Sequence, residues 1–275
     1  MNSEAFTSKN VFITGAGSGI GRAAAVKFAE RGAGNVYLID IREDRLERVA
    51  AEVKNLGARA IPIKCNLLDM ADCHRAIDAA LAESPRLDIM ISNAAPPPVP
   101  VPFLEMPDAV WLKDINGILN ASFVMGQMAA RSMATSGAGG CILFTISVNA
   151  AGAAPDFAAY CAAKGGLTAL VKVMAVELAR YNIRVNGVSP GPTDTERAAE
   201  FLGEEQMSAL RQAYPAAPIG RLATPDDIAN AFVYLASDAA SYVTGINLIV
   251  DGGLSAQMPA DMRVRSDEKV TRTPQ

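Results

Sequence analysis

The amino-acid sequence predicts an α/β fold, a doubly wound parallel sheet of about seven strands with helices on both faces. Short apolar runs alternate along the chain with helical stretches of about ten residues or more. These runs lack the polar alternation of strands that face water on one side, so the strands are expected to be buried on both faces. Strands that alternate with helices are usually joined by right-handed crossovers and form a parallel sheet.

Each expected element follows from its local pattern. Apolar, β-branched runs predict strands, and longer apolar or amphipathic stretches predict helices. The predicted strands span residues 10–14, 36–39, 60–64, 87–92, 141–146, 183–188 and 246–250. The predicted helices span residues 20–31, 43–55, 70–83, 108–133, 157–180 and 225–236, and Gly57 is placed to cap the second of them. We expect one domain over residues 1–258, followed by a polar C-terminal tail, 259–275.

Composition and charge argue against several classes of function. The formal net charge is −4 and no basic run is present, so no nucleic-acid partner is expected. The four cysteines show no C-x-x-C spacing and His74 is the single histidine, so no metal site is expected. Residues 1–10 lack the apolar stretch of a signal peptide, and the uncharged stretch 132–155 is broken by polar residues. We therefore expect a cytoplasmic protein with reduced thiols and no membrane partner.

A glycine-rich loop follows the first predicted strand. Residues 14–21 read Thr-Gly-Ala-Gly-Ser-Gly-Ile-Gly and lead into a helix. Glycines let the backbone approach a diphosphate closely, and the helix N-terminus offers free N–H groups and partial positive charge. Asp40 ends the next strand, where a carboxylate can bind the ribose hydroxyls and repel a 2′-phosphate. The context predicts a Rossmann-type site that prefers NAD to NADP, although Arg42 or Arg22 could offset the charge of Asp40.

Tyr160 and Lys164 lie one turn apart on the same face of a predicted helix. A tyrosine hydroxyl ordinarily has a pKa near 10. An ammonium group close to it stabilises the phenolate and brings the pKa nearer to a range useful for general acid–base catalysis. A pair at this spacing is also common on helix surfaces, so the assignment depends on what accompanies it.

Further motifs accompany the pair. In chain order they are the glycine loop, Asp40, Asn93, Asn116, Ser147, Tyr160-Cys161-Ala162-Ala163-Lys164 and Pro190-Gly191. Their order and spacing resemble those of the short-chain dehydrogenase/reductases, and the resemblance extends over about residues 9–253. Segments 237–245 and 250–253 resemble the C-terminal signature of that family.

The resemblance implies an oxidoreductase that moves a hydride between NAD and a secondary alcohol or ketone. It implies that Ser147 orients the substrate oxygen and that Tyr160 takes or gives the hydroxyl proton. It also implies that Lys164 binds the nicotinamide ribose and lowers the tyrosine pKa, while Asn116 holds a water that relays protons. The cofactor-binding residues that it implies are Gly15, Gly17, Ser18, Gly19, Ile20, Asp40, Ile41, Asn66, Leu67, Asn93, Ala94, Tyr160, Lys164, Pro190, Gly191, Thr193 and Thr195.

Two positions depart from the family pattern. Ala95 stands where the family often has glycine, and its methyl group is expected to require some loop adjustment near the cofactor. Asn66 stands where the family often has an acid that contacts the adenine amino group. An amide oxygen can accept the same hydrogen bond, so we expect cofactor binding to be retained.

Structural explanations stay open for several of these residues. Ser147 suits a turn at a strand end, Asn116 suits a polar helix surface, and Thr195 suits the N-cap of a following helix. Cys161 is expected to be a packed thiol, because neighbouring helix positions diverge and no histidine is placed to activate it.

The substrate pocket is expected to lie in loops. The proline-rich segment 96–102 favours a stiff polyproline geometry, or it is simply a connector. The other expected pocket positions carry mostly small or apolar residues without a cluster of arginines or lysines, and they are Val148, Asn149, Ala150, Ala153 and the segment 195–214. A neutral, fairly apolar cyclic or aromatic alcohol or ketone fits this lining best.

Two other functions and one assembly hypothesis remain. An NADPH-dependent 3-oxoacyl reductase would share the catalytic residues, and Asp40 argues against it. A non-catalytic dinucleotide-binding protein would not need the intact set of Ser147, Tyr160 and Lys164. The resemblance also implies a homodimer or homotetramer, formed through long helices whose apolar residues could equally belong to the core, namely Met125, Met128, Met133, Leu170 and Met174.

Overall fold

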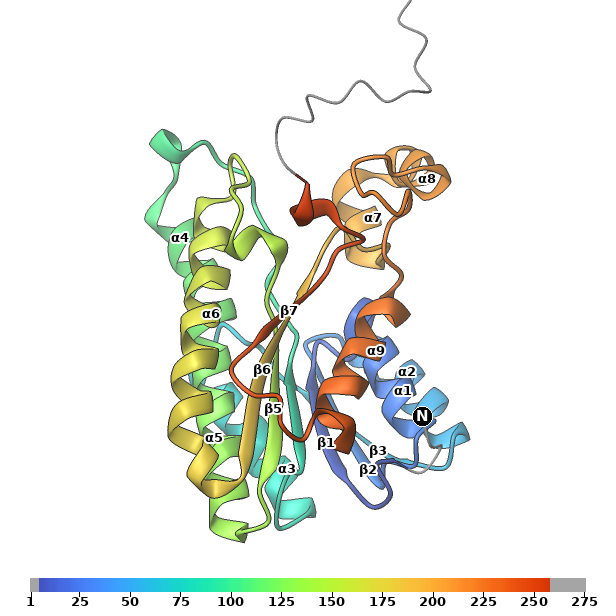
Figure 1. Cartoon of the computed structure of the whole chain (residues 1–275), viewed down its shortest axis with the longest axis vertical. Coiled ribbons are helices and arrows are strands. Elements are labelled where there is room, and N and C mark those ends of the chain that lie inside the picture. Colours follow the sequence, from blue (N-terminus) through green and yellow to red (C-terminus); the bar gives the residue numbers. More distant parts are fainter. Residues whose placement is uncertain (1–4, 258–275) are drawn as a thin grey trace, which may run out of the picture.

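Seven strands form one sheet in the order β3-β2-β1-β4-β5-β6-β7 in the computed structural model, which describes residues 5–257 (Figure 1). Every pair of neighbouring strands is parallel. The strand bounds are β1 Asn10–Thr14, β2 Asn35–Asp40, β3 Arg59–Lys64, β4 Ile89–Ser92, β5 Gly140–Thr145, β6 Ile183–Pro190 and β7 Asn247–Val250. The predicted doubly wound α/β fold is therefore confirmed.

Ten helices of more than three residues accompany the sheet in the described part of the chain. They are α1 Gly19–Ala29, α2 Glu43–Asn55, α3 Met70–Glu83, α4 Asp108–Asp114, the π-helix η2 Ile115–Asn120, α5 Ala121–Ser136, α6 Ala158–Leu178, α7 Glu196–Leu202, α8 Glu204–Gln212 and α9 Pro225–Ala236. Short 3-10 turns are η1 Phe103–Glu105, η3 Val148–Ala150, η4 Ala179–Tyr181, η5 Asp238–Ala240 and η6 Leu254–Ala256.

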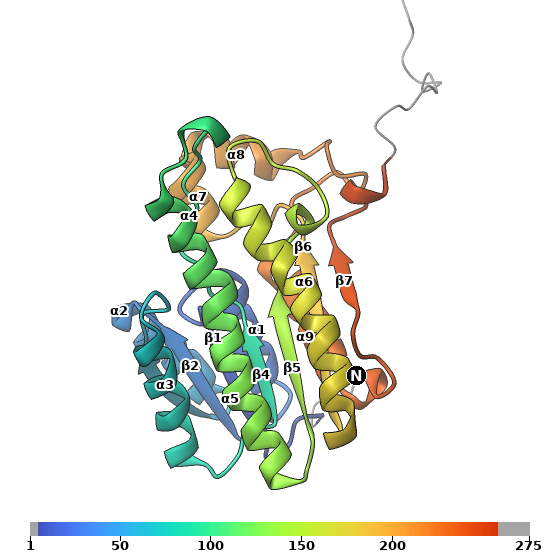
Figure 2. The same cartoon turned by 90° about the vertical axis from the view of Figure 1, so that its left-hand side faces the viewer.

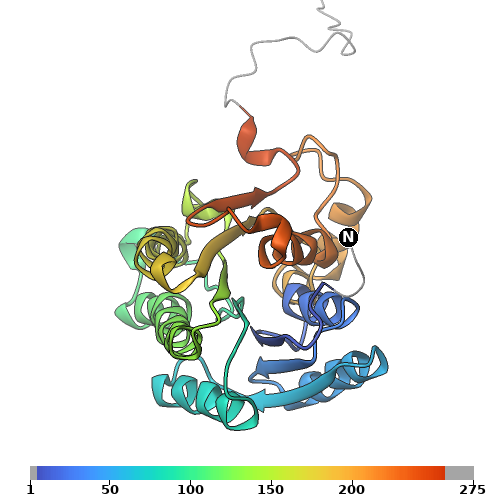
Figure 3. The same ribbon diagram turned by 60° about the horizontal axis from the view of Figure 1, so that its bottom comes forward.

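Successive residues of β1 point to opposite faces of the sheet. Val11 and Ile13 lie in the buried cluster beneath α1, α2 and α9, whereas Phe12 lies in the cluster beneath α3, α5 and α6. Figures 1 and 3 show these two groups of helices on opposite sides of the strands. Both faces are covered along the central strands β1, β2, β4, β5 and β6, and this explains why their sequences lack polar alternation. The edge strands β3 and β7 are partly exposed, so the expectation of burial on both faces was wrong for them.

The order in which the strands are added to the sheet reverses at β1. From β1 it proceeds through β2 to β3, and it then returns to place β4 on the other side of β1. Such a reversal opens a crevice at the carboxyl ends of the strands, because the crossovers on the two sides diverge there. The sheet order therefore positions a ligand site beyond Thr14 of β1 and Ser92 of β4.

The long helix predicted over residues 108–133 is divided in the structure. It consists of α4, a π-helical turn and α5, and it continues to Ser136. In the π-helical turn the backbone N–H of Ala121 donates to the carbonyl of Asn116, five residues earlier. Apolar spacing cannot reveal one inserted residue in a continuous helix, and such insertions are frequent at functional sites.

Two short helices, α7 and α8, were not predicted. Both lie in the segment 195–214 that was expected to form pocket loops. Met207 is the single buried residue among the two helices, so their sequences carry little of the apolar periodicity on which helix prediction depends. The proposed tail, 259–275, and the boundary before it lie outside the described residues.

Helix α6 is the most apolar long helix described. Residues Ala158–Tyr181 are long and apolar enough to cross a membrane by length and composition alone, which is weak evidence because core helices pass the same test. One face of α6 packs on the sheet through Ala163, Leu167 and Val171 (Figure 2).

The apolar residues proposed for an assembly surface belong largely to the core. Met125 and Met133 are fully buried, so of the two alternatives left open, assembly surface or core, the core applies to both. Met128, Leu170 and Met174 are partly buried and pack against the same cluster. The exposed apolar residues of α5 and α6 are instead Phe123, Val173 and Val176.

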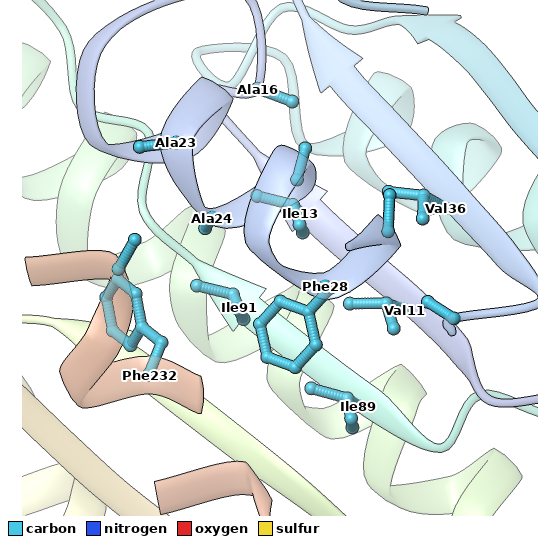
Figure 4. Close-up of a cluster of buried hydrophobic side chains, with 14 of the residues drawn as sticks. Val11, Ile13, Ala16, Ala23, Ala24, Phe28, Val36, Ile89, Ile91 and Phe232 are labelled. Atoms are coloured by element: carbon cyan, nitrogen blue, oxygen red, sulfur yellow. The ribbon is translucent and has the colours of Figure 1, made fainter. Parts of the chain in front are cut away.

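Phe28 tests the packing between α1 and the sheet. Its ring is fully buried and points among Val11, Ile89 and Ile91 (Figure 4). Phe28→Ala should lower the free energy of unfolding by about 3–5 kcal/mol, because it removes buried apolar area and leaves a cavity. Urea denaturation followed by circular dichroism measures the change. Leu56→Ala, at the exposed C-cap position that follows α2, should cost less than about 1 kcal/mol. Equal costs for the two variants would contradict this description of the core.

Candidate active site

The carboxyl ends of the strands border two adjoining cavities. Their volumes are about 370 and 470 Å³, a size suited to small-molecule ligands. The first contains Ser147, Tyr160 and Lys164, and the second contains Asn66 and Leu67. Residues that border both cavities mark where they join, and they are Gly15, Ser18, Asp40, Ala94, Ala95, Pro96, Pro98 and Arg197. The two cavities together form one elongated cleft.

The glycine loop leaves no room for side chains at two of its positions. A Cβ atom on Gly21 would lie 2.1 Å from the carbonyl oxygen of Gly15, so α1 packs directly against the preceding turn. A Cβ atom on Gly17 would lie 2.9 Å from Oδ2 of Asp40. The loop follows β1 and opens α1, so it is a backbone cradle with helical N–H groups at its end. This arrangement fits the diphosphate of a dinucleotide.

Asp40 is held by the backbone on both of its carboxylate oxygens. Oδ2 accepts a hydrogen bond from the N–H of Gly17 at 3.0 Å, and Oδ1 accepts one from the N–H of Arg42 at 3.1 Å. Three arginines near this carboxylate have carboxylate partners of their own. These ion pairs are Arg22–Glu52 at 2.8 Å, Arg42–Asp44 at 3.0 Å and Arg45–Glu200 at 2.7 Å. The guanidinium groups are therefore compensated without Asp40.

Ile41, Asn66 and Leu67, which were predicted to lie near the adenosine, line the second cavity. The side-chain oxygen of Asn66 accepts a hydrogen bond from the N–H of Leu68 at 3.1 Å, which closes a local turn. Its backbone N–H donates to Asp72 at 2.7 Å. The structure thus places Asn66 at the cavity wall and fixes its backbone, while the adenine contact stays a prediction.

Asn93 connects the ends of three strands. Its side-chain nitrogen donates to the carbonyl of Thr14 at 3.1 Å, and its side-chain oxygen accepts from Oγ1 of Thr145 at 3.0 Å. The hydroxyl oxygen of Thr14 accepts hydrogen bonds from the backbone N–H groups of Asn93 and Ala94, at 2.9 and 3.0 Å. Sequence reasoning assigned no role to Thr14 or Thr145. Their positions at strand ends before loops were the available signal.

The proline-rich loop borders the cleft and is more than a connector. Pro96 and Pro98 line both cavities. The loop is tied down at Pro97, whose carbonyl accepts a hydrogen bond from Nζ of Lys113 at 2.7 Å. The backbone N–H of Val101 donates to the carbonyl of Asp156 at 2.8 Å, which joins this loop to the segment before α6.

Ser147, Tyr160 and Lys164 are brought together in the first cavity. The oxygen Oγ of Ser147 accepts from the N–H of Asn149 at 3.1 Å, so the serine side chain also caps η3. The ammonium of Lys164 is buried and donates to the carbonyl of Thr145 at 2.7 Å. It lies 5.7 Å from the centre of the Tyr160 ring. The spacing of Tyr160 and Lys164 along α6 thus places both side chains in the same cavity.

Burial dominates the electrostatics of this group. It raises the pKa of Tyr160, whereas hydrogen bonding to Ser147 and the charge of Arg197 act in the opposite direction more weakly. Burial lowers the pKa of Lys164 to about 7; Arg197 lowers it further and Asp114 raises it. The surrounding protein therefore disfavours the phenolate, opposite to the lowered tyrosine pKa that the resemblance implied. A bound positive nicotinamide is the charge that would favour it.

Asn116 lies in the π-helical turn and lines neither cavity. Its side-chain oxygen accepts a hydrogen bond from Asn120 at 2.8 Å. Two residues earlier, Asp114 is buried, and one of its carboxylate oxygens has no hydrogen-bond partner within residues 5–257. Burial raises the pKa of Asp114, and its charge raises the pKa of Lys164. Sequence reasoning missed Asp114, although a charge between apolar helix positions was a usable signal.

The residues predicted to lie near the nicotinamide line the first cavity, and they are Pro190, Gly191, Thr193 and Thr195. The hydroxyl of Thr193 donates to the carbonyl of Gly191 at 2.9 Å, which keeps this turn closed. The oxygen Oγ1 of Thr195 accepts from the N–H of Ala198 at 3.2 Å. Thr195 therefore caps α7, as one reading of the sequence expected, and it also faces the cleft.

Only some of the residues predicted to form the substrate pocket line the first cavity. Of the four predicted positions after β5, Asn149 lines the first cavity, whereas Val148, Ala150 and Ala153 do not. Ala154 and Phe157 line it as well. Arg197, from the segment that was interpreted as free of basic clusters, reaches both cavities and was missed. A single arginine in a polar helix gives little sequence signal, since most such residues face water.

Comparison with known proteins identifies many relatives of the whole chain. A family profile described as enoyl-(acyl carrier protein) reductase matches residues 15–255. Cis-4-hydroxycyclohexanecarboxylate dehydrogenase of Sinomonas cyclohexanicum is 37% identical over 254 residues, which cover 92% of this chain and 99% of that protein. L-Rhamnose 1-dehydrogenase (NAD(P)(+)) of Sphingomonas sp. (strain SKA58) is 35% identical over 246 residues, which cover 90% of this chain and 96% of that protein.

Solved structures show the same likeness. The crystal structure of carveol dehydrogenase from Mycobacterium avium in complex with NAD has a TM-score of 0.85 and 29% sequence identity to this chain. The match covers 92% of this chain and 100% of the other.

The lowered pKa of Lys164 predicts a pH dependence of stability. Between about pH 7 and the usual lysine pKa of 10.5, the buried amine is neutral when folded and protonated when unfolded. The unfolded state then binds more protons, so stability from this group rises with pH over that range. The free energy of unfolding of Lys164→Met relative to wild type should therefore be most favourable below pH 7 and should fall towards pH 10. Urea denaturation at several pH values measures it. A difference that does not vary with pH would show that the pKa of Lys164 is close to 10.5.

Proposed function

The chain belongs to the short-chain dehydrogenase/reductase family, and on that premise we propose that it is an NAD-dependent oxidoreductase that interconverts a secondary alcohol and a ketone. One observation carries the proposal. Ser147, Tyr160 and Lys164 line one end of a cleft, and Asp40 lies where the two halves of that cleft meet. A dinucleotide that extends along this cleft would present its reactive ring to the three side chains.

Each of the three side chains has a role that suits its position. The hydroxyl of Ser147 hydrogen-bonds the substrate oxygen and holds it beside Tyr160. Tyr160 takes the proton of an alcohol or gives one to a ketone, as a general base or acid. Lys164, held by the carbonyl of Thr145, contacts the nicotinamide ribose and, in its protonated form, supplies positive charge near the phenol. NAD supplies the hydride acceptor when it is bound.

We propose that Asn116 completes the catalytic set through a water that connects Lys164 to solvent. The support is its place in a π-helical turn close to α6, together with the buried carboxylate of Asp114 two residues earlier. The remaining residues that the sequence suggested for the cofactor line the same cleft, with the exception of Gly17, whose backbone N–H donates to Asp40.

Asp40 supports NAD as the preferred cofactor. A carboxylate at the end of the second strand can bind two ribose hydroxyls, and it repels a 2′-phosphate. Arg22, Arg42 and Arg45 are each paired with a different carboxylate, so these three arginines do not offset the charge of Asp40. Arg197 borders the same junction of the cavities and is the unpaired arginine beside Asp40 in the described part of the chain. This feature also separates the proposal from an NADPH-dependent 3-oxoacyl reductase. The intact set of Ser147, Tyr160 and Lys164 separates it from a non-catalytic binding protein.

A cyclic or aromatic alcohol or ketone is the proposed substrate. Ala154, Phe157 and Pro98 provide apolar wall in the first cavity beside the catalytic residues. A relative that is 37% identical acts on a hydroxycyclohexanecarboxylate, in which the carbon that bears the hydroxyl belongs to a ring.

NAD should be preferred over NADP in steady-state kinetics on one substrate. We expect kcat/KM to be at least about tenfold higher with NAD, equivalent to about 1.4 kcal/mol. Asp40→Ala should lower the ratio of kcat/KM with NAD to kcat/KM with NADP, since it removes both the ribose contact and the repulsion of a 2′-phosphate. Equal or better efficiency of the wild type with NADP would contradict the cofactor assignment.

Tyr160→Phe should retain the fold and the affinity for NAD, because only a hydroxyl is lost. Its turnover should fall by about 10²–10⁴-fold, which is typical for the loss of a general acid–base group. Alcohol oxidation by the wild type should rise with pH as Tyr160 ionises, with an apparent pKa below that of free tyrosine, and the variant should lack this limb. Tyr181→Phe, which changes a partly exposed tyrosine after α6, is the matched control. Near-normal turnover of Tyr160→Phe with an unchanged pH profile would exclude Tyr160 as the proton-transferring residue.

We also propose a cytoplasmic homodimer or homotetramer that uses the outer faces of α5 and α6. Phe123, Val173 and Val176 are exposed by 46%, 54% and 81% in the single chain, which is unusual for a contiguous helix pair. Light scattering at micromolar concentration should give at least twice the mass of 28.8 kDa. Val176→Glu should shift the protein towards smaller species. A wild-type monomer would refute the assembly.

A further inference from the structure

Helix α7 is fastened to the glycine loop by a carboxylate. The backbone N–H of Gly19, the first residue of α1, donates to Oε2 of Glu196 at 2.9 Å. Ser18 precedes Gly19 and does not cap α1 with its own side chain. One turn along α7, Glu200 pairs with Arg45 at 2.7 Å. The first N–H of α1 is therefore satisfied by an anion that comes from α7.

This N–H group belongs to the diphosphate cradle. The N-terminal N–H groups of a helix bind anions because they are unpaired and carry partial positive charge. Glu196 and a diphosphate are both anions, and they cannot both occupy the position in front of Gly19 without repulsion. The carboxylate of Glu196 therefore occupies the kind of site that a phosphate oxygen requires.

Arg197, the next residue, carries a positive charge into the same part of the cleft. It borders the cavity of Ser147 and Tyr160 as well as the cavity of Asn66. Its guanidinium makes no hydrogen bond or ion pair within residues 5–257, in contrast to the paired Arg22, Arg42 and Arg45. Burial against the cleft lowers its pKa, whereas the charges of Tyr160, Asp40 and Glu200 act in the opposite direction more weakly.

The place of Arg197 identifies the counter-ion. A dinucleotide's diphosphate joins its two nucleosides, so it passes through the junction of the two cavities, opposite the glycine loop. A substrate carboxylate would lie deeper in the first cavity, beside Asn149 and Phe157, which do not border the second. A guanidinium can bind two phosphate oxygens at once, and such charge-assisted bonds are among the strongest.

We propose that Arg197 is a diphosphate-binding residue and that Glu196 is a built-in competitor for the same anion site. The inference rests on the proposed dinucleotide function and adds two residues to it. Binding of the diphosphate releases Glu196 from Gly19 and gives Arg197 its counter-ion. Because the two residues are adjacent on α7, cofactor binding and the position of α7, which borders the catalytic cavity, become coupled.

Binding measurements on the full chain test the proposal without turnover. The probes are NADH, ADP-ribose and adenosine, titrated by calorimetry; the first two carry the diphosphate and adenosine does not. Arg197→Gln should lower the affinity for NADH and ADP-ribose by about tenfold or more and leave the affinity for adenosine unchanged. Glu196→Gln should raise the affinity for NADH and ADP-ribose by about three- to tenfold, again without an effect on the affinity for adenosine. Arg197→Lys should recover part of the lost affinity.

Matched controls separate local effects from net charge. Arg48→Gln on α2 and Glu205→Gln on α8 remove one charge each at exposed positions that face solvent. Both should bind all three probes as the wild type does. Thermal unfolding of each variant checks that its fold is retained.

The outcomes distinguish the inference from the function on which it rests. A wild type that binds neither NADH nor ADP-ribose would overturn both. A wild type that binds NADH, together with an Arg197→Gln variant within twofold of it, would overturn the role of Arg197 and leave the oxidoreductase proposal intact. The same holds if Arg197→Gln changes only the KM of carboxylate-bearing substrates. An unchanged or weaker affinity in Glu196→Gln would refute the competition.

Discussion

The hydroxyl of Thr14 holds the crevice from which the rest of the site is built. It accepts hydrogen bonds from the N–H groups of Asn93 and Ala94, and Asn93 extends the connection to Thr145. The ends of β1, β4 and β5 are thereby fixed relative to one another at the point where the sheet order reverses. The glycine loop starts directly after Thr14, and Lys164 is held by the carbonyl of Thr145. The glycine loop and the buried amine of Lys164 therefore share one support.

Charged side chains at the rim of the cleft and deeper within it are stabilised in different ways. Arg22, Arg42 and Arg45 have their own carboxylates, and Asp40 is held by backbone N–H groups. Deeper in the cleft the balance is different, because burial disfavours both a protonated Lys164 and an ionised Tyr160. Asp114 and Arg197 act on these two groups through their fields, with opposite effects on the pKa of Lys164. A bound cofactor would change this balance, since it adds charges to the same low-dielectric space.

Prediction from sequence was most accurate where one physical effect dominates. Helices α2, α3 and α9 have the predicted bounds, because charged or capping residues at their ends coincide with clear apolar periodicity. Prediction failed for α7 and α8, which bury almost nothing, and for the π-helical turn, which changes hydrogen bonding without changing composition. Met125 and Met133 show the same limit, since a helix between a sheet and another helix is apolar on more than one side.

The sequence by itself determined the α/β alternation, the glycine loop with Asp40, and the Tyr160–Lys164 pair. These depend on local spacing and on residue types that permit few alternatives. The tertiary structure alone decided which side chains converge on the cleft. Glu196 meets Gly19 across 177 residues of chain, and Thr14 meets Asn93 across 79. Neither contact has a periodicity or a local signal, because it arises from the order in which strands are placed in the sheet. Burial of Lys164 and its shifted pKa follow from the same placement, since they depend on what the folded chain packs around the amine.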